Sequence, residues 1–323
     1  TLQRRCPART EGHGTYPQGS MALQNDLRMK WHTGGMTVRL ILINVAVFVA
    51  LVVAYLVLLP VGGSGLGAQV LRDQYIVQWL RSTADLDVLV TRPWTVFTYM
   101  FVHTGLGHIF WNMLLLWFGG RLFEDLLGGR RLLGHYLLGG LSGLALYVLV
   151  NNTMPGLHGH PTAGTAILGA SAGVLSVFVG IAAYRPEMIV NLLLIGPVKL
   201  MYVAAVFLLL DLVGIGSGDG VAHEAHIGGA LYGFVAARQL TRGRDWSKGF
   251  VDLLDRLAAP FRRRKGPRLR VEKRPTGGVR PTSNTAQQKQ ARIDAILDKI
   301  SRSGYDSLSK EEKDLLFKAS NDQ

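Results

Sequence analysis

The chain has 323 residues and a formal net charge of +13, yet 48% of its residues are hydrophobic and its mean hydropathy is +0.22. An ordinary soluble domain does not combine these values, whereas a protein with apolar membrane segments and a separate basic tail does. The single cysteine, Cys6, excludes an internal disulfide bond and a cysteine-based metal site.

Six segments are apolar enough to be membrane helices, for which about 20 residues suffice to cross a hydrocarbon core of roughly 30 Å. The first covers residues 40–60 and holds no charge, and a connection with glycine-rich and amphipathic pieces follows at 61–105. Turn residues at 151–156 divide a long charge-free stretch into two helices. The predicted helices after the first cover residues 106–122, 132–151, 166–184, 198–214 and 222–240.

Basic residues indicate how this all-α membrane bundle is oriented. They follow the second, fourth and sixth helices, whereas the connections at 152–165 and 214–222 contain no Lys or Arg. Because cytoplasmic loops carry the excess of Lys and Arg, both termini are predicted to be cytoplasmic. The short apolar stretch at 187–197 is then expected at the cytoplasmic interface.

A strongly basic run follows the sixth helix. Residues 238–274 contain thirteen Lys or Arg against four acidic residues. A nucleic-acid-binding arm is compatible with such a run. Directly after a membrane helix, however, attraction to anionic lipid headgroups explains it better. We therefore expect the lipid bilayer, and no nucleic acid, as its partner.

These segments define four parts of the chain. Residues 1–36 form an N-terminal cytoplasmic segment, 37–240 the six-helix domain, 241–289 a basic juxtamembrane segment with a polar linker, and 290–320 a small helical appendage.

Two short helices are predicted in the appendage. Gly304 ends the first helix, and Ser309 with Glu312 forms a capping box for the second. Four apolar residues share one face of the first helix: Ile293, Ile296, Leu297 and Ile300.

Four polar side chains from three predicted helices are expected in one layer of the membrane. Ser171 lies about five residues into the fourth helix, and His226 about four residues into the sixth. His108 lies early in the second helix, with Asn112 one turn further on the same face. At about 1.5 Å per residue, all four fall in roughly the outer third of the bilayer. Because polar groups inside a membrane are costly, each is a candidate for function.

Small residues predict a close contact between the fourth and sixth helices. Gly169 and Gly173 flank the serine in a G-x-S-x-G run, and Gly229 with Gly233 forms a GxxxG face after the histidine. Such residues allow helix backbones to approach closely. If the GxxxG face meets the fourth helix near Gly173, the serine and the histidine come within hydrogen-bonding reach.

This pairing predicts nucleophilic chemistry. A serine hydroxyl becomes a good nucleophile when a base accepts its proton, and histidine is the usual base near neutral pH. Ser171 and His226 are therefore candidate catalytic residues, and His108 and Asn112 are candidate donors to an oxyanion. Structural interpretations stay open, because Gly, Ala and Ser are common helix-packing residues in membranes and Asn112 can simply join two helices.

The histidines also raise the alternative of a metal site. His103, His108, His223 and His226, with Glu224, offer ligand types that zinc accepts. However, His223 lies at a helix edge and the sequence contains no HExxH motif. We therefore expect no metal and no other cofactor.

Three motifs follow one another in a fixed order along the chain. The run from Phe101 to Asn112 reads H-x4-H-x3-N, Gly169-Ala170-Ser171 reads G-x-S, and Ala225-His226 is followed by Gly229 and Gly233. Together they resemble the rhomboid family of intramembrane serine proteases. Further similarities to the family lie at Pro93-Trp94, Thr98 through Phe101, Gly120-Arg121 and Glu124, and the resemblance spans about residues 37–240.

The resemblance implies a six-helix rhomboid bundle with a membrane-embedded first loop, in a bacterial plasma membrane. It implies that Ser171 attacks and that His226 acts first as base and then as acid, without a catalytic aspartate. His108, Asn112 and the Ser171 backbone amide would hold the oxyanion. Substrates would be single-pass membrane proteins, cut where small or helix-breaking residues let the helix open. Substrate identity and oligomeric state do not follow from the sequence.

Two positions depart from the family pattern. The family often has glycine directly after the serine, where this chain has Ala172, and an aromatic residue four positions after it, where this chain has Leu175. Neither change removes a catalytic group, but a lost restraint on His226 predicts altered activity. Two other functions compete: an inactive rhomboid-like scaffold that binds membrane clients, and a transporter, which would show an internal repeat or paired broken helices.

Overall fold

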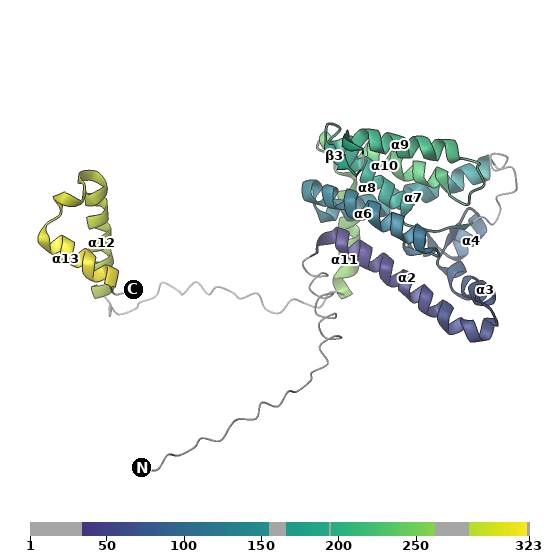
Figure 1. The fold of residues 1–323 in the computed structure, drawn as a ribbon, viewed down its shortest axis with the longest axis horizontal. Helices are drawn as coiled ribbons and strands as arrows, with labels where there is room; N and C mark the ends of the chain where they lie inside the picture. Colours follow the sequence, from purple (N-terminus) through teal and green to yellow (C-terminus); the bar gives the residue numbers. More distant parts are fainter. Residues whose placement is uncertain (1–33, 155–165, 194, 262–283, 322–323) are drawn as a thin grey trace, which may run out of the picture. The chain divides into compact units, whose positions relative to one another are not determined.

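The computed structural model describes residues 34–154, 166–193, 195–261 and 284–321. The chain divides into two compact units, Thr1–Arg262 and Arg263–Gln323, which are described separately (Figure 1). Cys6, most of the predicted N-terminal segment and the basic run from residue 262 onward lie outside the described residues.

Each of the six predicted segments holds a helix in the first unit (Figure 1). Among the described residues, the helices Gly35–Gly62 and Gly129–Thr153 are long and apolar enough to cross a membrane, and Ser171–Tyr184 and Leu200–Gly214 are apolar but shorter. That all six cross a bilayer stays a prediction. The helices are α2 (Gly35–Gly62), α6 (Leu106–Leu127), α7 (Gly129–Thr153), α8 (Ser171–Tyr184), α9 (Leu200–Gly214) and α10 (His223–Thr241).

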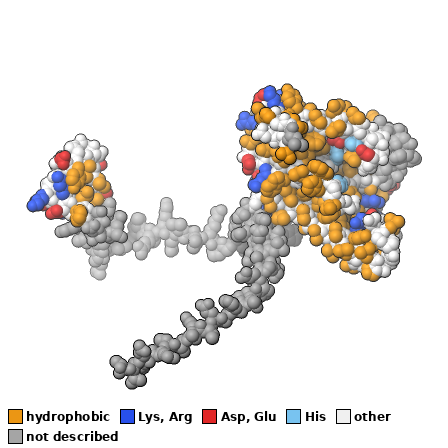
Figure 2. Space-filling view, in the orientation of Figure 1, with side chains coloured by type: hydrophobic (Ala, Val, Ile, Leu, Met, Phe, Trp, Pro, Cys, Tyr) orange, Lys and Arg blue, Asp and Glu red, His pale blue; other side chains and the backbone are white. Residues whose placement is uncertain are grey.

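Apolar side chains cover most of the visible face of this unit (Figure 2). Many of the exposed large apolar residues belong to α2, α6 and α9. On α2, Val57 and Val61 are 68% and 76% exposed, and Val213 of α9 is 75% exposed. Exposed apolar surface of this extent is typical of a face that contacts lipid or another protein.

The connection between α2 and α6 is folded. It contains α3 (Gly65–Tyr75), η1 (Val77–Trp79), β1 (Ser82–Thr83), α4 (Leu86–Thr91), α5 (Thr95–Thr98) and η2 (Tyr99–Phe101). Two capped helix starts explain part of this order: Ser64 accepts the backbone N–H of Gly67, and Asp85 accepts those of Asp87 and Val88.

The fourth helix begins five residues later than predicted. Ala166–Ile167 forms strand β2, which pairs antiparallel with β1, with Ser82 opposite Ile167. Gly169 has a φ of +117°, which no residue inside an α-helix adopts. The helix α8 therefore starts at Ser171, and the prediction that this serine lies five residues into a helix is wrong.

A second difference lies between α8 and α9. The segment expected at the cytoplasmic interface forms a hairpin of β3 (Ile189–Leu192) and β4 (Gly196–Lys199), with Leu192 opposite Gly196. Gly196 is the first residue of β4 and has a φ of +90°, a backbone conformation that glycine adopts more readily than other residues.

Helix α8 lies at the centre of the bundle. All residues from Ala172 to Ala182 are buried, and the helix packs against α6, α7 and α10. A Cβ atom on Gly229 of α10 would lie 2.1 Å from the Ala172 carbonyl oxygen, and one on Gly233 would lie 2.1 Å from that of Ser176. The GxxxG face thus meets α8 at Ala172 and Ser176. Gly173, expected at this contact, instead faces the Tyr136 carbonyl of α7.

Glu124, near the end of α6, caps the start of α2. Its carboxylate accepts the backbone N–H groups of Met36 at 2.5 Å and Thr37 at 2.9 Å, and the Thr37 hydroxyl at 2.7 Å. The first N–H groups of a helix have no intrahelical acceptor and form its positive end, so a carboxylate stabilises them. This contact joins α2 to the rest of the bundle.

A seventh long helix, α11 (Trp246–Ala258), follows α10. Asp245 accepts the backbone N–H groups of Ser247 and Lys248 at its start, and pairs with Arg131 of α7 at 2.7 Å. The helix packs against α7. Trp246, Leu253 and Leu257, by contrast, are 51%, 51% and 62% exposed.

The second unit consists of α12 (Asn284–Ser303), η5 (Tyr305–Ser307) and α13 (Lys310–Asn321). The capping box is confirmed: the Ser309 N–H donates to Glu312 Oε2 at 2.8 Å, and the Glu312 N–H donates to Ser309 Oγ at 3.3 Å. Ile296 is buried as predicted, whereas Leu297 is 51% exposed and does not belong to the buried face.

We expect Gly233→Ala to lower the stability of the bundle. The added methyl group would collide with the Ser176 carbonyl oxygen, and overpacking of this kind costs about 1–3 kcal/mol. Thermal unfolding of the purified protein in detergent should show a lower Tm. Gly249→Ala is the matched control, because a Cβ at Gly249 of α11 has no neighbour within 4 Å. Equal Tm values for the two variants would contradict the close α8–α10 contact.

Candidate active site

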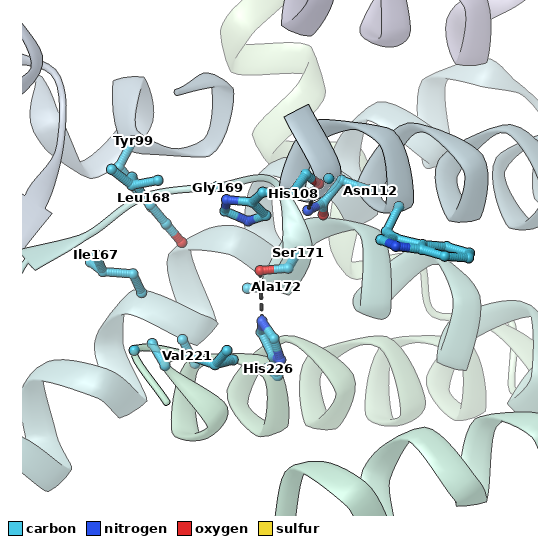
Figure 3. A pocket seen from close by; sticks show the side chains of 15 residues that line it. Tyr99, His108, Asn112, Ile167, Leu168, Gly169, Ser171, Ala172, Val221 and His226 are labelled. Atoms are coloured by element: carbon cyan, nitrogen blue, oxygen red, sulfur yellow. Dashed lines mark hydrogen bonds between the residues drawn. The ribbon is translucent and has the colours of Figure 1, made fainter. Parts of the chain in front are cut away.

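Ser171 and His226 form the centre of the site. The serine is the first residue of α8 and the histidine is the fourth residue of α10. His226 Nε2 lies 2.7 Å from Ser171 Oγ, and the two side chains point toward each other (Figure 3). The structure thus brings together the two residues that the sequence analysis paired. An imidazole in this position can accept the hydroxyl proton.

Asp211 is a member of this cluster that the sequence analysis missed. Its Oδ1 lies 2.7 Å from His226 Nδ1, on the side of the ring opposite Ser171. It is the one charged residue in α9 and is only 7% exposed. The signal for it was present in the sequence, because an ionisable residue in an otherwise apolar membrane segment is a candidate for function.

His223 contacts the same carboxylate. Its Nδ1 lies 2.8 Å from Asp211 Oδ1, and its Nε2 lies 3.1 Å from Asp219 Oδ2. Asp219 belongs to the connection before α10, where the backbone N–H of Val221 donates to it at 2.8 Å. This hydrogen bond, followed by the one from His223, lowers the pKa of the Asp219 carboxyl. Asp219 is therefore ionised at neutral pH.

His108 and Asn112 of α6 line the same cavity as Ser171 (Figure 3). The Asn112 side-chain amide donates one hydrogen bond to the His108 carbonyl at 2.9 Å. A side-chain amide has two N–H hydrogens, so Asn112 can donate a second hydrogen bond.

Gly169 and His103 position the His108 ring. A Cβ on Gly169 would lie 2.7 Å from His108 Nε2, so glycine leaves the space that this ring occupies. His103 is fully buried, stacks edge-on with His108 at a centroid distance of 4.9 Å, and accepts the Ala170 N–H at 3.4 Å. Gly169, predicted to serve helix packing, thus lies outside the helices and borders the site.

The residues of the site surround a cavity of about 380 Å³ (Figure 3). Its polar groups are His108, Asn112, Ser171 and His226, and much of the remaining wall is apolar. Because Ser171 opens α8, the first backbone N–H groups of that helix have no intrahelical acceptor. They add the positive end of a helix to the serine side of the cavity. The apolar lining residues include Tyr99, Trp111, Ile167, Leu168, Ala172, Val221, Ala222 and Ala225.

The two family departures fit the packing. A Cβ on Gly143 of α7 would lie 2.6 Å from the Ala172 Cβ, which is too close. A glycine at this position of α7 therefore makes room for the Ala172 side chain. Leu175 is 5% exposed and belongs to the buried face of α8. Both positions are therefore filled by packed side chains, and Ser171 and His226 are in contact in their presence.

The histidines considered for a metal site form two separate groups. His103 and His108 stack on each other, whereas His223 and His226 share Asp211, and Glu224 accepts a hydrogen bond from Asn151 at 2.9 Å. The ligand atoms of Asp211, His223 and His226 lie within 4.8 Å of one another. The hydrogen bonds that join Asp211 to His223 and His226 are made by these same ligand atoms.

Two family models match parts of the chain. Residues 90–243 match the family model described as "Rhomboid domain", and residues 283–322 match "Family of unknown function (DUF6576)". The chain belongs to the rhomboid family, which confirms the resemblance seen in its motifs. The family is membrane-embedded, in agreement with the apolar helices of the first unit.

Two curated relatives are similar to the chain. "RHOMBOID-like protein 12, mitochondrial" of Arabidopsis thaliana is 28% identical over 158 residues, which are 46% of this chain and 47% of the relative. "Rhomboid protease GluP" of Bacillus subtilis (strain 168) is 28% identical over 151 residues, which are 46% of this chain and 26% of the relative. The matched region therefore spans about half of one relative and about a quarter of the other.

We expect Gly169→Ala to displace His108 and to slow any reaction of Ser171. An alanine at a φ of +117° is strained by about 1–2 kcal/mol, and its methyl group would collide with the His108 ring. The rate at which a fluorescent fluorophosphonate labels Ser171 should fall about five- to thirtyfold, the factor that corresponds to a loss of 1–2 kcal/mol. Gly107→Ala is the control, because Gly107 lines the same cavity and a Cβ there has no neighbour within 4 Å. Equal labelling rates for the two variants would remove Gly169 from this role.

Proposed function

We propose that this protein is an intramembrane serine endopeptidase that cleaves transmembrane segments of membrane-protein substrates. The observation that carries the proposal is the 2.7 Å contact between Ser171 Oγ and His226 Nε2 at a cavity. Membership of the rhomboid family supports it, as does the name of the Bacillus subtilis relative, a rhomboid protease.

The proposed reaction is acyl transfer in two halves. His226 Nε2 takes the Ser171 hydroxyl proton while the serine oxygen bonds to the substrate carbonyl carbon, and the carbonyl π electrons move to its oxygen. The tetrahedral species collapses, the C–N bond breaks, and His226 gives its proton to the leaving amine. Water then repeats the sequence on the acyl-enzyme, which releases the acid product and restores Ser171.

The negative oxygen formed in this reaction needs hydrogen-bond donors. We assign this role to His108, to the second N–H of Asn112 and to the Ser171 backbone N–H. Preorganised donors of this kind are a large contribution to acyl-transfer catalysis. The side chains of His108 and Asn112 line the cavity next to Ser171, and Ser171 opens α8, which supports the assignment.

The length of α8 supports a reaction below the membrane surface. Its 14 residues span about 21 Å, which is less than a hydrocarbon core of roughly 30 Å. If its C-terminus is at the cytoplasmic interface, Ser171 lies several Å inside the outer boundary. A substrate helix hides its carbonyl groups in hydrogen bonds, so it must unwind locally before it is cut. Small or helix-breaking residues in a single-pass substrate would favour this unwinding.

The cellular setting belongs to the same proposal. We place the chain in a bacterial plasma membrane as a multi-pass protein, and the asymmetry of Lys and Arg supports an orientation with both termini in the cytoplasm. The basic run after α10 and the exposed apolar residues of α11, among them Trp246 and Leu253, support contact with anionic lipids. No nucleic acid is part of this proposal.

We expect both Ser171→Ala and His226→Ala to abolish proteolysis and fluorophosphonate labelling, because each removes a group that takes part in the proton transfer. The measurement uses the detergent-purified protein, a fluorescent fluorophosphonate, and a quenched single-span peptide with small and helix-breaking residues. Both variants should keep the Tm of the unchanged protein. Cleavage that persists in Ser171→Ala would overturn the mechanism, and folded protein that neither labels nor cleaves would favour the inactive scaffold.

Asn112→Ala tests the oxyanion assignment. Loss of one oxyanion donor costs up to about 2–4 kcal/mol, so cleavage of the same peptide should slow by about ten- to a thousandfold. Most of the loss should be in kcat, since the donor acts on a charge that forms during the reaction. Asn152→Ala is the control, because Asn152 of α7 lies outside the cavity lining. A rate equal to that of the control would exclude Asn112 from this role.

A further inference from the structure

Asp211 contacts the ring nitrogen of His226 that points away from the nucleophile. Its Oδ1 lies 2.7 Å from His226 Nδ1, while His226 Nε2 lies 2.7 Å from Ser171 Oγ. The three groups come from α9, α10 and α8, so three separate helices bring them into one line. The side chains of Asp211 and His226 are only 10% and 17% exposed, so water screens their contact weakly.

This contact fixes which nitrogen of His226 carries the proton. An ionised carboxylate only accepts hydrogen bonds, so the nitrogen that faces it must be the N–H. Neutral His226 is therefore protonated at Nδ1 and keeps its Nε2 lone pair for the serine proton. In the opposite tautomer, Nε2 carries a hydrogen and cannot act as the base.

His223 and Asp219 complete the charge balance around Asp211. Both ring nitrogens of His223 face carboxylate oxygens, at 2.8 Å and 3.1 Å. Both must then donate, which requires the positively charged imidazolium form. Two carboxylates and one imidazolium leave one net negative charge beside His226. That charge is balanced at the moment when His226 accepts the serine proton.

We propose that Asp211 is a positioning residue for His226, so that the site works as a Ser171–His226–Asp211 triad and not as a Ser–His pair. The inference rests on the proposed protease function and adds a residue to it. Asp211 does not line the cavity, so it acts on the reaction through His226 alone. Other titratable groups near this part of the site are His223, Asp219, His108 of α6 and Tyr99 of η2.

Asp211→Asn is the decisive substitution because it keeps the shape and removes the charge. The new amide can also donate to Nδ1, which favours the unproductive tautomer of His226. We expect kcat for the quenched single-span peptide to fall by about 10²- to 10⁴-fold. KM should change by less than about threefold, since Asp211 does not line the cavity. Asp211→Glu, which keeps the charge, should recover part of the lost kcat.

The split between kcat and KM, together with the charge-keeping variant, separates positioning from a structural role. A substitution that only loosened the fold would lower the Tm, and Asp211→Glu would then recover none of the lost kcat.

Glu224→Gln is the matched control. Glu224 is also a buried carboxylate, two residues before His226, but its carboxylate accepts a hydrogen bond from Asn151 of α7. We expect kcat within about threefold of the unchanged protein, because a glutamine can keep that hydrogen bond. If kcat of Asp211→Asn stays as close to that of the unchanged protein as kcat of Glu224→Gln, the triad is overturned.

A measurement on the resting protein keeps this inference separable from the proposed function. In ¹⁵N-histidine NMR spectra of the full chain, with His226 assigned by its loss in His226→Gln, Nδ1 should be protonated and Nε2 unprotonated. In Asp211→Asn that pattern should be lost. An unchanged His226 tautomer in Asp211→Asn would overturn the positioning role even if proteolysis is confirmed. Conversely, an Asp211-dependent tautomer in a protein that cleaves nothing would overturn the proposed function alone.

Discussion

The geometry of the site depends on how closely α10 approaches α8. Gly229 and Gly233 place the α10 backbone where the Ala172 and Ser176 carbonyl groups leave no space for a side chain. Gly143 of α7 sits against Ala172 and the Ala225 carbonyl, so a third helix packs onto the same contact. Because Ser171 and His226 lie next to these contact points, the backbone approach fixes the 2.7 Å distance between their side chains. Larger residues at the contact would separate the pair.

Long charge-free segments made the helices predictable from the sequence, whereas the start of α8 was not. Residues 166–170 are as apolar and small as those that follow, so local composition gives no boundary. The boundary comes from a distant segment: β1 at Ser82–Thr83 pairs with β2 and keeps the chain extended before Ser171. The same non-local contacts decide that Gly173 faces α7, which a periodic pattern of small residues cannot show.

Asp211 marks a different limit of sequence reasoning. Its isolation in an apolar segment is visible in the sequence, but its partners are not, because they lie on the next helix. His223 and His226 are three positions apart, so both rings lie on one face of α10 and converge on α9. That convergence depends on the packing of α9 on α10. The resemblance to a family that uses a Ser–His pair also gave no reason to look for an aspartate.

Three carboxylates in this bundle, those of Glu124, Glu224 and Asp211, each accept hydrogen bonds from named partners, and the arrangement at the site has a direction. Glu124 neutralises the start of α2, and Glu224 accepts from Asn151. At the site, the positive end of α8 lies on the serine side, where the proposed reaction forms an oxyanion. Asp211 lies on the far side of His226, where the reaction forms an imidazolium. The fixed charges therefore oppose both new charges before the reaction begins, so little reorganisation is needed at the moment of proton transfer.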